Sequence, residues 1–189
     1  VLVQRLGVPF DRIRLVQGDS DQLIDGGGTG GSRSIMASGT AIVLASDKVI
    51  DNGKQLAGHF LEAAAADIEF AEGRFTIAGT DRSIGLLDLA DRLKQKPNLP
   101  DGVPTSLDVS MVVDSPPSAF PNGCHVCEVE IDPETGVVAI DKYTMVDDFG
   151  VIVNPMLVEG QVHGGVVQGI GQALFEETRY SKEGQLLTG

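Results

Sequence analysis

A segment dense in glycine, residues 25–34, constrains this chain more than any other feature. It reads Asp-Gly-Gly-Gly-Thr-Gly-Gly-Ser-Arg-Ser. Glycine permits positive φ and lets the backbone approach a ligand closely, so we expect a flexible loop here. An acidic segment at 16–21 leads into the loop, and residues 35–45 after it look helical. The sequence therefore predicts a strand, a glycine loop and the start of a helix in succession.

The junction between this loop and the helix has the chemistry of an anion site. Free N–H groups at a helix N-terminus favour a bound anion. Ser32, Arg33 and Ser34 add side-chain donors, and arginine can hold phosphate or carboxylate with two hydrogen bonds. A plain connection with a serine cap fits the same residues, so both interpretations stay open.

The charge balance excludes two classes of partner. The 189 residues carry a net charge of −13 and no basic run, whereas nucleic acids and anionic membrane surfaces both require clustered Lys and Arg. No apolar run is long enough to span a bilayer. The length allows one or two domains with a sizeable core. Because the chain starts at Val1 and stops at Gly189 in mid-pattern, we expect a piece of a longer polypeptide.

Periodicity and turn residues predict the elements of the first half of the chain. The predictions are a short helix ending near Gly7, a strand at 12–16, helices at 35–45 and 54–68, a hairpin at 68–77 that turns at Glu72 and Gly73, and a helix at 86–93. Prolines make 94–104 a loop or a boundary. A strand at 107–113 and a loop at 115–123 follow.

The same arrangement recurs in the second half. A hairpin within 124–146 turns at 132–136 and leads to a helix at 155–178, with Asn154 as N-cap and Pro155 as first residue. This helix carries many glycines and three amides: Gly160, Gly164, Gly165, Gly169, Gly171, Gln161, Gln168 and Gln172. Each glycine costs about 1 kcal/mol in a helix interior, so the run requires a reason. Close packing against another element and room for a flat, bulky cofactor are the two candidates.

Together these elements predict an α+β fold. We expect a two-layer α/β arrangement of mixed sheets with helices on one side, built from two related strand–Gly loop–helix units. The predicted first subdomain is 1–104, with the loop at 25–34. The predicted second subdomain is 105–189, with the hairpin 124–146 and the Gly-rich helix 155–178.

The two cysteines, Cys124 and Cys127, lie in a segment that alternates apolar and polar residues like a strand. Residues three apart on a strand point to opposite faces, which favours a structural role over a disulfide or a shared metal. His125 lacks further evident zinc ligands. Neither His59 nor His163 has an evident nucleophile partner.

Other phosphate-binding motifs fit less well. Gly26, Gly28 and Gly31 match the G-x-G-x-x-G spacing of dinucleotide-binding folds, which is a weak signal in so glycine-rich a loop. Asp47 falls at the distance of the ribose-binding acid, but such a site requires that residue at the end of a parallel strand. The loop continues Ser-Arg rather than Lys-Ser/Thr, which excludes a Walker A motif.

Two motif blocks carry a resemblance to a known family. They lie at 17–34, from Gln-Gly-Asp-Ser-Asp to Gly-Gly-Ser-Arg-Ser, and at 147–174, which opens Asp-Asp-Phe-Gly-Val-Ile-Val-Asn-Pro; 122–136 and 184–189 also match. In these blocks the sequence resembles the molybdenum-binding large subunit of the xanthine dehydrogenase, aldehyde oxidase and aerobic carbon monoxide dehydrogenase family. The match implies an internal to C-terminal part of that subunit.

The resemblance implies a molybdopterin cofactor, in its cytosine dinucleotide form, with molybdenum held by the cofactor and not by a protein ligand. The amide of Gln161 is implied to bond the pterin near the metal. The loop residues implied to lie against the pterin and its phosphates are Gly30, Gly31, Ser32, Arg33 and Ser34. No catalytic residue is expected in this chain, because the general-base glutamate of the family falls beyond Gly189.

The implied reaction is oxidation of an aldehyde, an N-heterocycle or purine, or carbon monoxide, with water as the oxygen source. The implied partners are the rest of the large subunit, iron–sulfur and FAD subunits or domains, and a second copy in a homodimer, in the cytoplasm. We expect the chain alone to be inactive and to lack the cofactor. A non-catalytic anion-binding or assembly module is the alternative.

Overall fold

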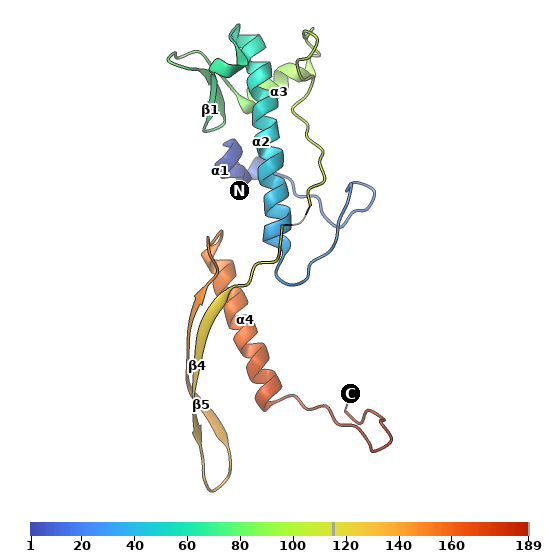
Figure 1. Cartoon of the computed structure of the whole chain (residues 1–189), viewed down its shortest axis with the longest axis vertical. Coiled ribbons are helices and arrows are strands. Elements are labelled where there is room, and N and C mark those ends of the chain that lie inside the picture. Colours follow the sequence, from blue (N-terminus) through green and yellow to red (C-terminus); the bar gives the residue numbers. More distant parts are fainter. Residues whose placement is uncertain (115, 189) are drawn as a thin grey trace. The chain divides into compact units, whose positions relative to one another are not determined.

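The computed structural model describes residues 1–114 and 116–188, which form two compact units, Val1–Ser118 and Ala119–Gly189 (Figure 1). Ser115, at the start of the predicted loop 115–123, and Gly189, at the end of the predicted second subdomain, lie outside the described residues.

The first unit combines one long helix with a small sheet. Its elements are α1 (Leu2–Leu6), a 3-10 turn (Phe10–Arg12), α2 (Ser34–Leu61), a second 3-10 turn (Ala65–Asp67), β1 (Ile68–Ala71), β2 (Arg74–Ile77), β3 (Ser83–Gly85) and α3 (Leu86–Lys94). The strands pair antiparallel in the order β1-β2-β3. The predicted hairpin at 68–77 and helix at 86–93 are confirmed, because tight turns and helical spacing are local signals.

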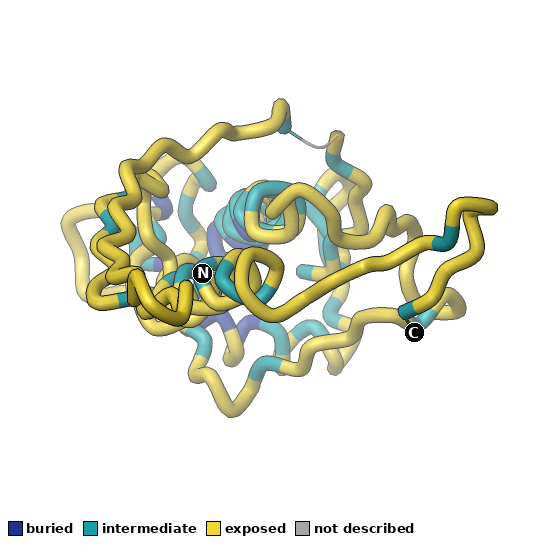
Figure 2. The backbone as a smooth tube through the Cα atoms, turned by 90° about the horizontal axis from the view of Figure 1, so that it is seen from below, coloured by how far each residue is buried: buried dark blue, intermediate teal, exposed yellow. Residues whose placement is uncertain are grey.

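The core of this unit forms where α2 meets the sheet and α3 (Figure 2). The buried apolar residues are Leu56, Ala57, Ile68, Phe75, Ile84, Leu86 and Leu89. Phe75 is fully buried and stacks at a tilt on Phe70, its cross-strand partner, with ring centroids 4.6 Å apart. Removing such apolar surface from water is the main stabilising contribution here.

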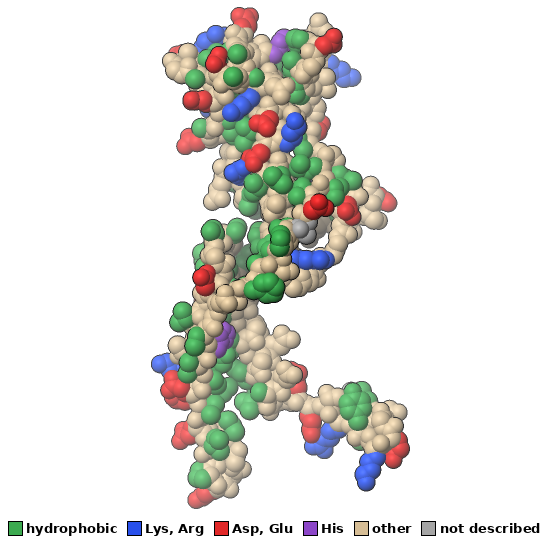
Figure 3. All heavy atoms as spheres, in the orientation of Figure 1, with side chains coloured by type: hydrophobic (Ala, Val, Ile, Leu, Met, Phe, Trp, Pro, Cys, Tyr) green, Lys and Arg blue, Asp and Glu red, His purple; other side chains and the backbone are tan. Residues whose placement is uncertain are grey.

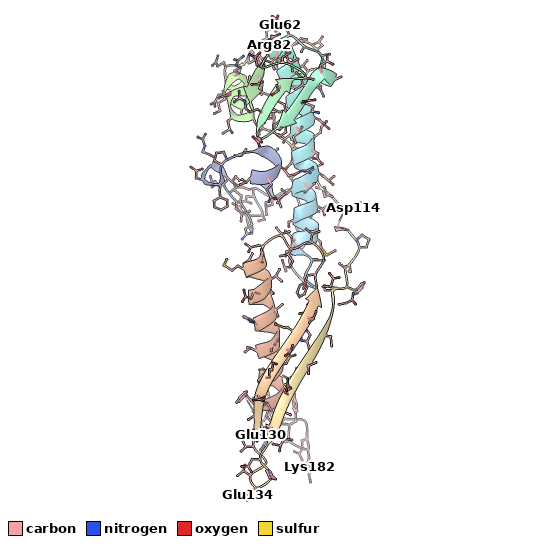
Figure 4. The ribbon with its side chains drawn as sticks, turned by 90° about the vertical axis from the view of Figure 1, so that its left-hand side faces the viewer. Glu62, Arg82, Asp114, Glu130, Glu134 and Lys182 are labelled. Atoms are coloured by element: carbon pink, nitrogen blue, oxygen red, sulfur yellow. The ribbon has the colours of Figure 1, made fainter. Side chains whose placement is uncertain are left out.

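Helix α2 is a single element of 28 residues, where the sequence predicted two helices at 35–45 and 54–68. The polar run after residue 46 does not break it, because Lys48 and Asp51 face solvent and the buried hydroxyl of Ser46 bonds the Ile42 carbonyl at 2.7 Å. The helix ends at Leu61, earlier than predicted, because Glu62 takes a left-handed conformation. Arg82 donates to the Leu61 carbonyl at 2.6 Å and lies beside this end of the helix (Figure 4).

Two predicted strands are absent. The strands predicted at 12–16 and 107–113 do not form, because alternation alone does not make a strand without a neighbour to pair with, and no such neighbour is found among the described residues. Asp108 instead forms a local turn, its N–H donating to the Ser106 hydroxyl at 2.7 Å. The glycine loop therefore follows an irregular segment, and the first of the two predicted strand–loop–helix units lacks its strand.

The second unit is a long hairpin with one helix. The hairpin pairs β4 (Asn122–Ile131) with β5 (Val138–Asp148), with a register shift between Glu128 and Val129. Helix α4 (Pro155–Leu174) runs beside the hairpin in both side views (Figures 1 and 4). It ends earlier than the predicted 178. Asn154 caps it as predicted, accepting from the Leu157 N–H at 3.4 Å.

No described residue of this second unit is buried. The half-buried residues of α4 are Val158, Val162, Val166, Ile170 and Gly171, and the first four form one stripe at four-residue spacing. Many apolar side chains of the unit remain on the surface (Figure 3). The α+β fold class is confirmed, but both sheets are antiparallel rather than mixed.

Candidate functional site

The glycine loop ends directly at the N-terminus of α2. Residues 25–33 form neither helix nor strand, and all of them are exposed. Gly28, Gly31 and Ser32 have positive φ, at 62°, 60° and 57°. A Cβ atom added to Gly26, Gly28, Gly30 or Gly31 would meet no heavy atom within 4 Å. The loop therefore presents open backbone, as expected of a segment that admits a ligand closely.

Side chains tie this loop to the start of the helix. The hydroxyls of Thr29 and Ser34 lie 2.6 Å apart. Arg33 folds back over the loop: its Nε donates to the Gly28 carbonyl at 3.3 Å, and its Nη2 donates to the carbonyls of Gly28, at 3.1 Å, and Gly27. The guanidinium is thus directed at loop carbonyl oxygens.

The first turn of α2 retains free donors. Arg33 is the N-cap and provides no side-chain cap; its carbonyl accepts from the Ala37 N–H at 2.9 Å. No acceptor for the N–H groups of residues 34–36 is found among the described residues, and the first turn holds no acidic side chain. Such an end carries the positive pole of the helix dipole, which attracts anions.

Helix α4 holds the remaining predicted residue, Gln161. Its side chain is exposed and makes no hydrogen bond within the described residues. The i, i+4, i+7, i+11 spacing puts Gln161, Gly165, Gln168 and Gln172 on one side of the helix. A Cβ atom on Gly160, Gly164, Gly165 or Gly169 would meet nothing within 4 Å. Nothing described in this chain therefore packs into these glycine positions.

The structure brings together the five predicted loop residues, 30–34, at the start of α2. Gln161 belongs to the other unit. Among the described residues no group of three or more His, Cys, Asp or Glu side chains is arranged to hold a metal ion. None of the helices described combines the length and apolar character needed to cross a membrane.

One polar cluster was missed by the sequence analysis. His125 lies between Tyr143 and Asp147, with Nδ1 3.1 Å from the Tyr143 hydroxyl and Nε2 2.9 Å from Asp147 Oδ1. Gly123 makes room for it, because a Cβ there would lie 1.8 Å from that carboxylate oxygen. The turn at 132–136 sets the register that pairs β4 with β5, and the strand alternation then puts these side chains on one face.

The structure bears on two alternatives raised by the sequence, at the cysteines and at Asp47. Cys124 and Cys127 lie in β4, as the alternation predicted, and both are exposed free thiols. Asp47 lies inside α2 and pairs with Arg5, so the interpretation as a dinucleotide-binding fold is wrong. The depression at the hairpin tip, lined by Glu130, Asp132 and neighbours, includes none of the predicted site residues.

Fold and local geometry first define a class: an α+β protein with an open glycine loop at one helix N-terminus and a second helix with an unfilled glycine face. The chain belongs to the molybdopterin cofactor-binding domain family, whose model matches residues 1–189.

Individual relatives agree with this membership. The chain is 32% identical over 188 residues to the carbon monoxide dehydrogenase large chain of Hydrogenophaga pseudoflava, and 36% identical over 185 residues to the nicotine 6-hydroxylase large subunit of Paenarthrobacter nicotinovorans. These alignments cover 99% and 97% of the chain. A crystal structure of the Cu,Mo-CO dehydrogenase matches with a TM-score of 0.89 and 33% identity over 98% of the chain. The chain spans 23% of each of these proteins.

The resemblance read from the two motif blocks is therefore confirmed. The chain is a molybdopterin-binding domain of the molybdenum hydroxylase type, and its relatives are molybdenum oxidoreductases.

Proposed function

We propose that this chain provides two walls of the molybdopterin site in a molybdenum hydroxylase, the Gly-rich loop 25–34 and the exposed face of α4 around Gln161. The whole enzyme would oxidise an aldehyde, an N-heterocycle or purine, or carbon monoxide, with water as the oxygen source. One observation carries the proposal: in a member of this family, both glycine-rich features are open where a Cβ atom would otherwise stand.

The donor chemistry of the loop fits a phosphate-bearing cofactor. Backbone N–H groups at the start of α2 and the hydroxyls of Ser32 and Ser34 can donate to phosphate oxygens. Two carbonyls of the loop, those of Gly27 and Gly28, already accept hydrogen bonds from Arg33. Their lone pairs are therefore less repulsive to an anion bound at the loop.

The face of α4 fits the flat part of such a cofactor. Glycine at positions 160, 164, 165 and 169 leaves the helix backbone uncovered, and a planar ring system can lie close to it. The Gln161 amide offers both a donor and an acceptor, which matches the mixed hydrogen-bonding edge of a pterin. When bound, the cofactor supplies redox-active molybdenum; these residues bind and orient it.

The remaining parts of the enzyme lie outside this chain on our proposal. We assign no general base or metal ligand here, and propose the rest of the large subunit, iron–sulfur and FAD subunits and a second copy as partners of a cytoplasmic enzyme. Two facts support the proposal that the isolated chain is inactive and free of cofactor. The second unit has no buried residue among those described, and the whole chain spans 23% of the length of these relatives. The cytosine dinucleotide form of the cofactor is part of the proposal.

Cofactor analysis of the full-length protein tests this function. After expression in a host that makes molybdopterin, we expect equimolar molybdenum and pterin, with cytosine nucleotide released on hydrolysis. Gln161→Ala should accelerate loss of the cofactor about fivefold, the effect of one lost hydrogen bond. Gln172→Ala, about three turns further along the same face, is the matched control and should retain cofactor like the unchanged protein. A full-length protein with neither molybdenum nor pterin would contradict the proposal.

A further inference from the structure

Arg33 makes more hydrogen bonds to the glycine loop than any other side chain described there. Two of its nitrogens reach two successive carbonyls, five and six residues earlier in the chain. The hydroxyl pair of Thr29 and Ser34, 2.6 Å apart, ties the same segment a second time. The loop is thus closed on itself at the start of α2 by two side-chain links.

The side-chain links offset the conformational entropy that the loop loses when it is ordered. A segment with five glycines in the six positions 26–31 loses more conformational freedom on ordering than any other composition would. A charged donor makes stronger hydrogen bonds to a carbonyl than a neutral one. The planar fork of arginine also loses less freedom per bond than lysine, whose ammonium is a single point charge. Arginine is therefore the side chain suited to hold such a loop in one shape.

The position of the guanidinium distinguishes two roles. A residue that grips an anion directly would present its fork away from the loop. Here the fork is turned toward the carbonyls of Gly27 and Gly28, which also neutralises oxygens that would repel an anion. A Cβ at Gly27 would lie 3.6 Å from the Arg33 Nη2, an ordinary van der Waals distance, so the guanidinium lies directly against this part of the loop.

We propose that Arg33 is a positioning residue: it clamps the loop through the carbonyls of Gly27 and Gly28 and pre-forms the anion-binding backbone before the cofactor arrives. This inference rests on the proposed function of the loop. It assigns direct contact with the cofactor to the backbone and to Ser32 and Ser34, and assigns to Arg33 an action through the loop.

The test separates the contribution of the Arg33 charge from that of its forked shape, in the full-length large subunit. Arg33→Lys keeps the charge but lacks the fork, whereas Arg33→Gln removes the charge. Thr29→Val removes the second link. Arg14→Lys is the matched control, because Arg14 is exposed just ahead of the loop and makes no hydrogen bond within the described residues. Each variant is prepared with cofactor, and without it from a host that cannot make molybdopterin.

We expect the Arg33 variants to change both the rate of amide exchange and the rate of molybdenum loss. In the cofactor-free protein, rapid-quench amide exchange of residues 26–34 should be about tenfold faster in Arg33→Lys and in Arg33→Gln, the loss of a charge-assisted bond. Thr29→Val should have a smaller effect in the same direction. In the loaded protein, both Arg33 variants should lose molybdenum faster and to a similar degree.

Any other pattern overturns the proposal. Retention of cofactor by Arg33→Lys but not by Arg33→Gln would show that charge alone matters and that Arg33 grips the anion. Unchanged exchange in the cofactor-free variants would show that no clamp exists, and faster exchange with normal retention would show that the clamp does not serve the cofactor. If the unchanged protein held no pterin, the proposed function would fail, while the cofactor-free exchange would still test the clamp.

Discussion

The ring of Phe75 lies directly against Gly53 in α2. A Cβ atom added to Gly53 would lie 2.1 Å from Cζ of Phe75, and both residues are buried. A glycine in the middle of a long helix is thus explained by the close approach of an aromatic ring from β2. This contact determines how closely α2 packs on the small sheet.

Gly53→Ala should destabilise the chain by about 1–3 kcal/mol, the usual cost of overfilling a packed core. Helix propensity alone predicts the opposite sign, a gain of about 1 kcal/mol for alanine over glycine. The apparent midpoint of thermal unfolding of the 189-residue chain measures the balance, and we expect it to fall. Gly39→Ala in the same helix is the control, since its Cβ would lie 3.4 Å from the flexible end of Ile35; it should leave the midpoint unchanged or raise it. A rise for Gly53→Ala would show that Phe75 yields, contrary to this account.

A second glycine contact joins α1 to the β1–β2 turn. Gly7 ends α1 with φ of 63°, and a Cβ there would lie 2.4 Å from the backbone N of Gly73. Gly7→Ala should therefore lower the unfolding midpoint through both backbone strain and a clash with backbone. Gly18→Ala isolates the strain, because Gly18 has φ of 70° and nothing within 4 Å of the added atom. Equal effects of the two substitutions would mean that the contact between Gly7 and Gly73 contributes nothing.

A substitution in α4 can decide whether its glycines serve close packing against another element or leave room for a flat cofactor. Gly164→Ala should preserve or increase the helix content of the 189-residue chain by circular dichroism, because alanine favours helix by about 1 kcal/mol and meets no atom here. In the full-length protein we expect normal yield and stability without cofactor, but reduced molybdenum and pterin content. Packing against another part of the subunit predicts poor yield or stability instead. Normal cofactor content would contradict the cofactor explanation.

The hairpin turn should show a specific dependence on pH. The hydroxyl of Thr135, together with the backbone N–H groups of Glu134 and Thr135, stabilises the Asp132 carboxylate and holds its pKa below the usual value. A lowered pKa in the folded state adds stability that is complete above the usual pKa and is lost as the pH falls through the folded one. NMR titration of the Asp132 carboxyl measures this shift directly. Thr135→Val should raise the pKa toward its usual value while Thr135→Ser keeps it low; identical titrations for the two variants would refute the assignment.

Local patterns predicted the elements that depend only on local chemistry. The turn at Glu72 and Gly73, the cap at Asn154 and the apolar spacing of α3 each act within a few residues, and these elements form as predicted. The strand at 12–16 and the break in α2 were predicted wrongly, because both depend on distant partners. A strand requires a neighbour to pair with, and Gly53 is accommodated by Phe75, 22 residues later in the sequence.

At the candidate site, too, the sequence predicted the features that depend on local composition but not those that depend on the folded conformation. Glycine content alone marked the loop and the α4 face as places of close backbone approach. The return of Arg33 to the carbonyls of Gly27 and Gly28 depends on the conformation of the loop, and the contact of His125 with Asp147 depends on the register of the hairpin. Composition carries neither kind of information, so a role as anion ligand was the natural expectation for Arg33.

The most direct test of the central claim is an experimental structure of the full-length large subunit with its cofactor bound. We predict one molybdopterin in hydrogen-bonding contact with both the loop at Gly30–Ser34 and the side-chain amide of Gln161, with Arg33 still on the carbonyls of Gly27 and Gly28. A cofactor that touches only one of the two features, or neither, would contradict the claim that this chain forms two walls of one site.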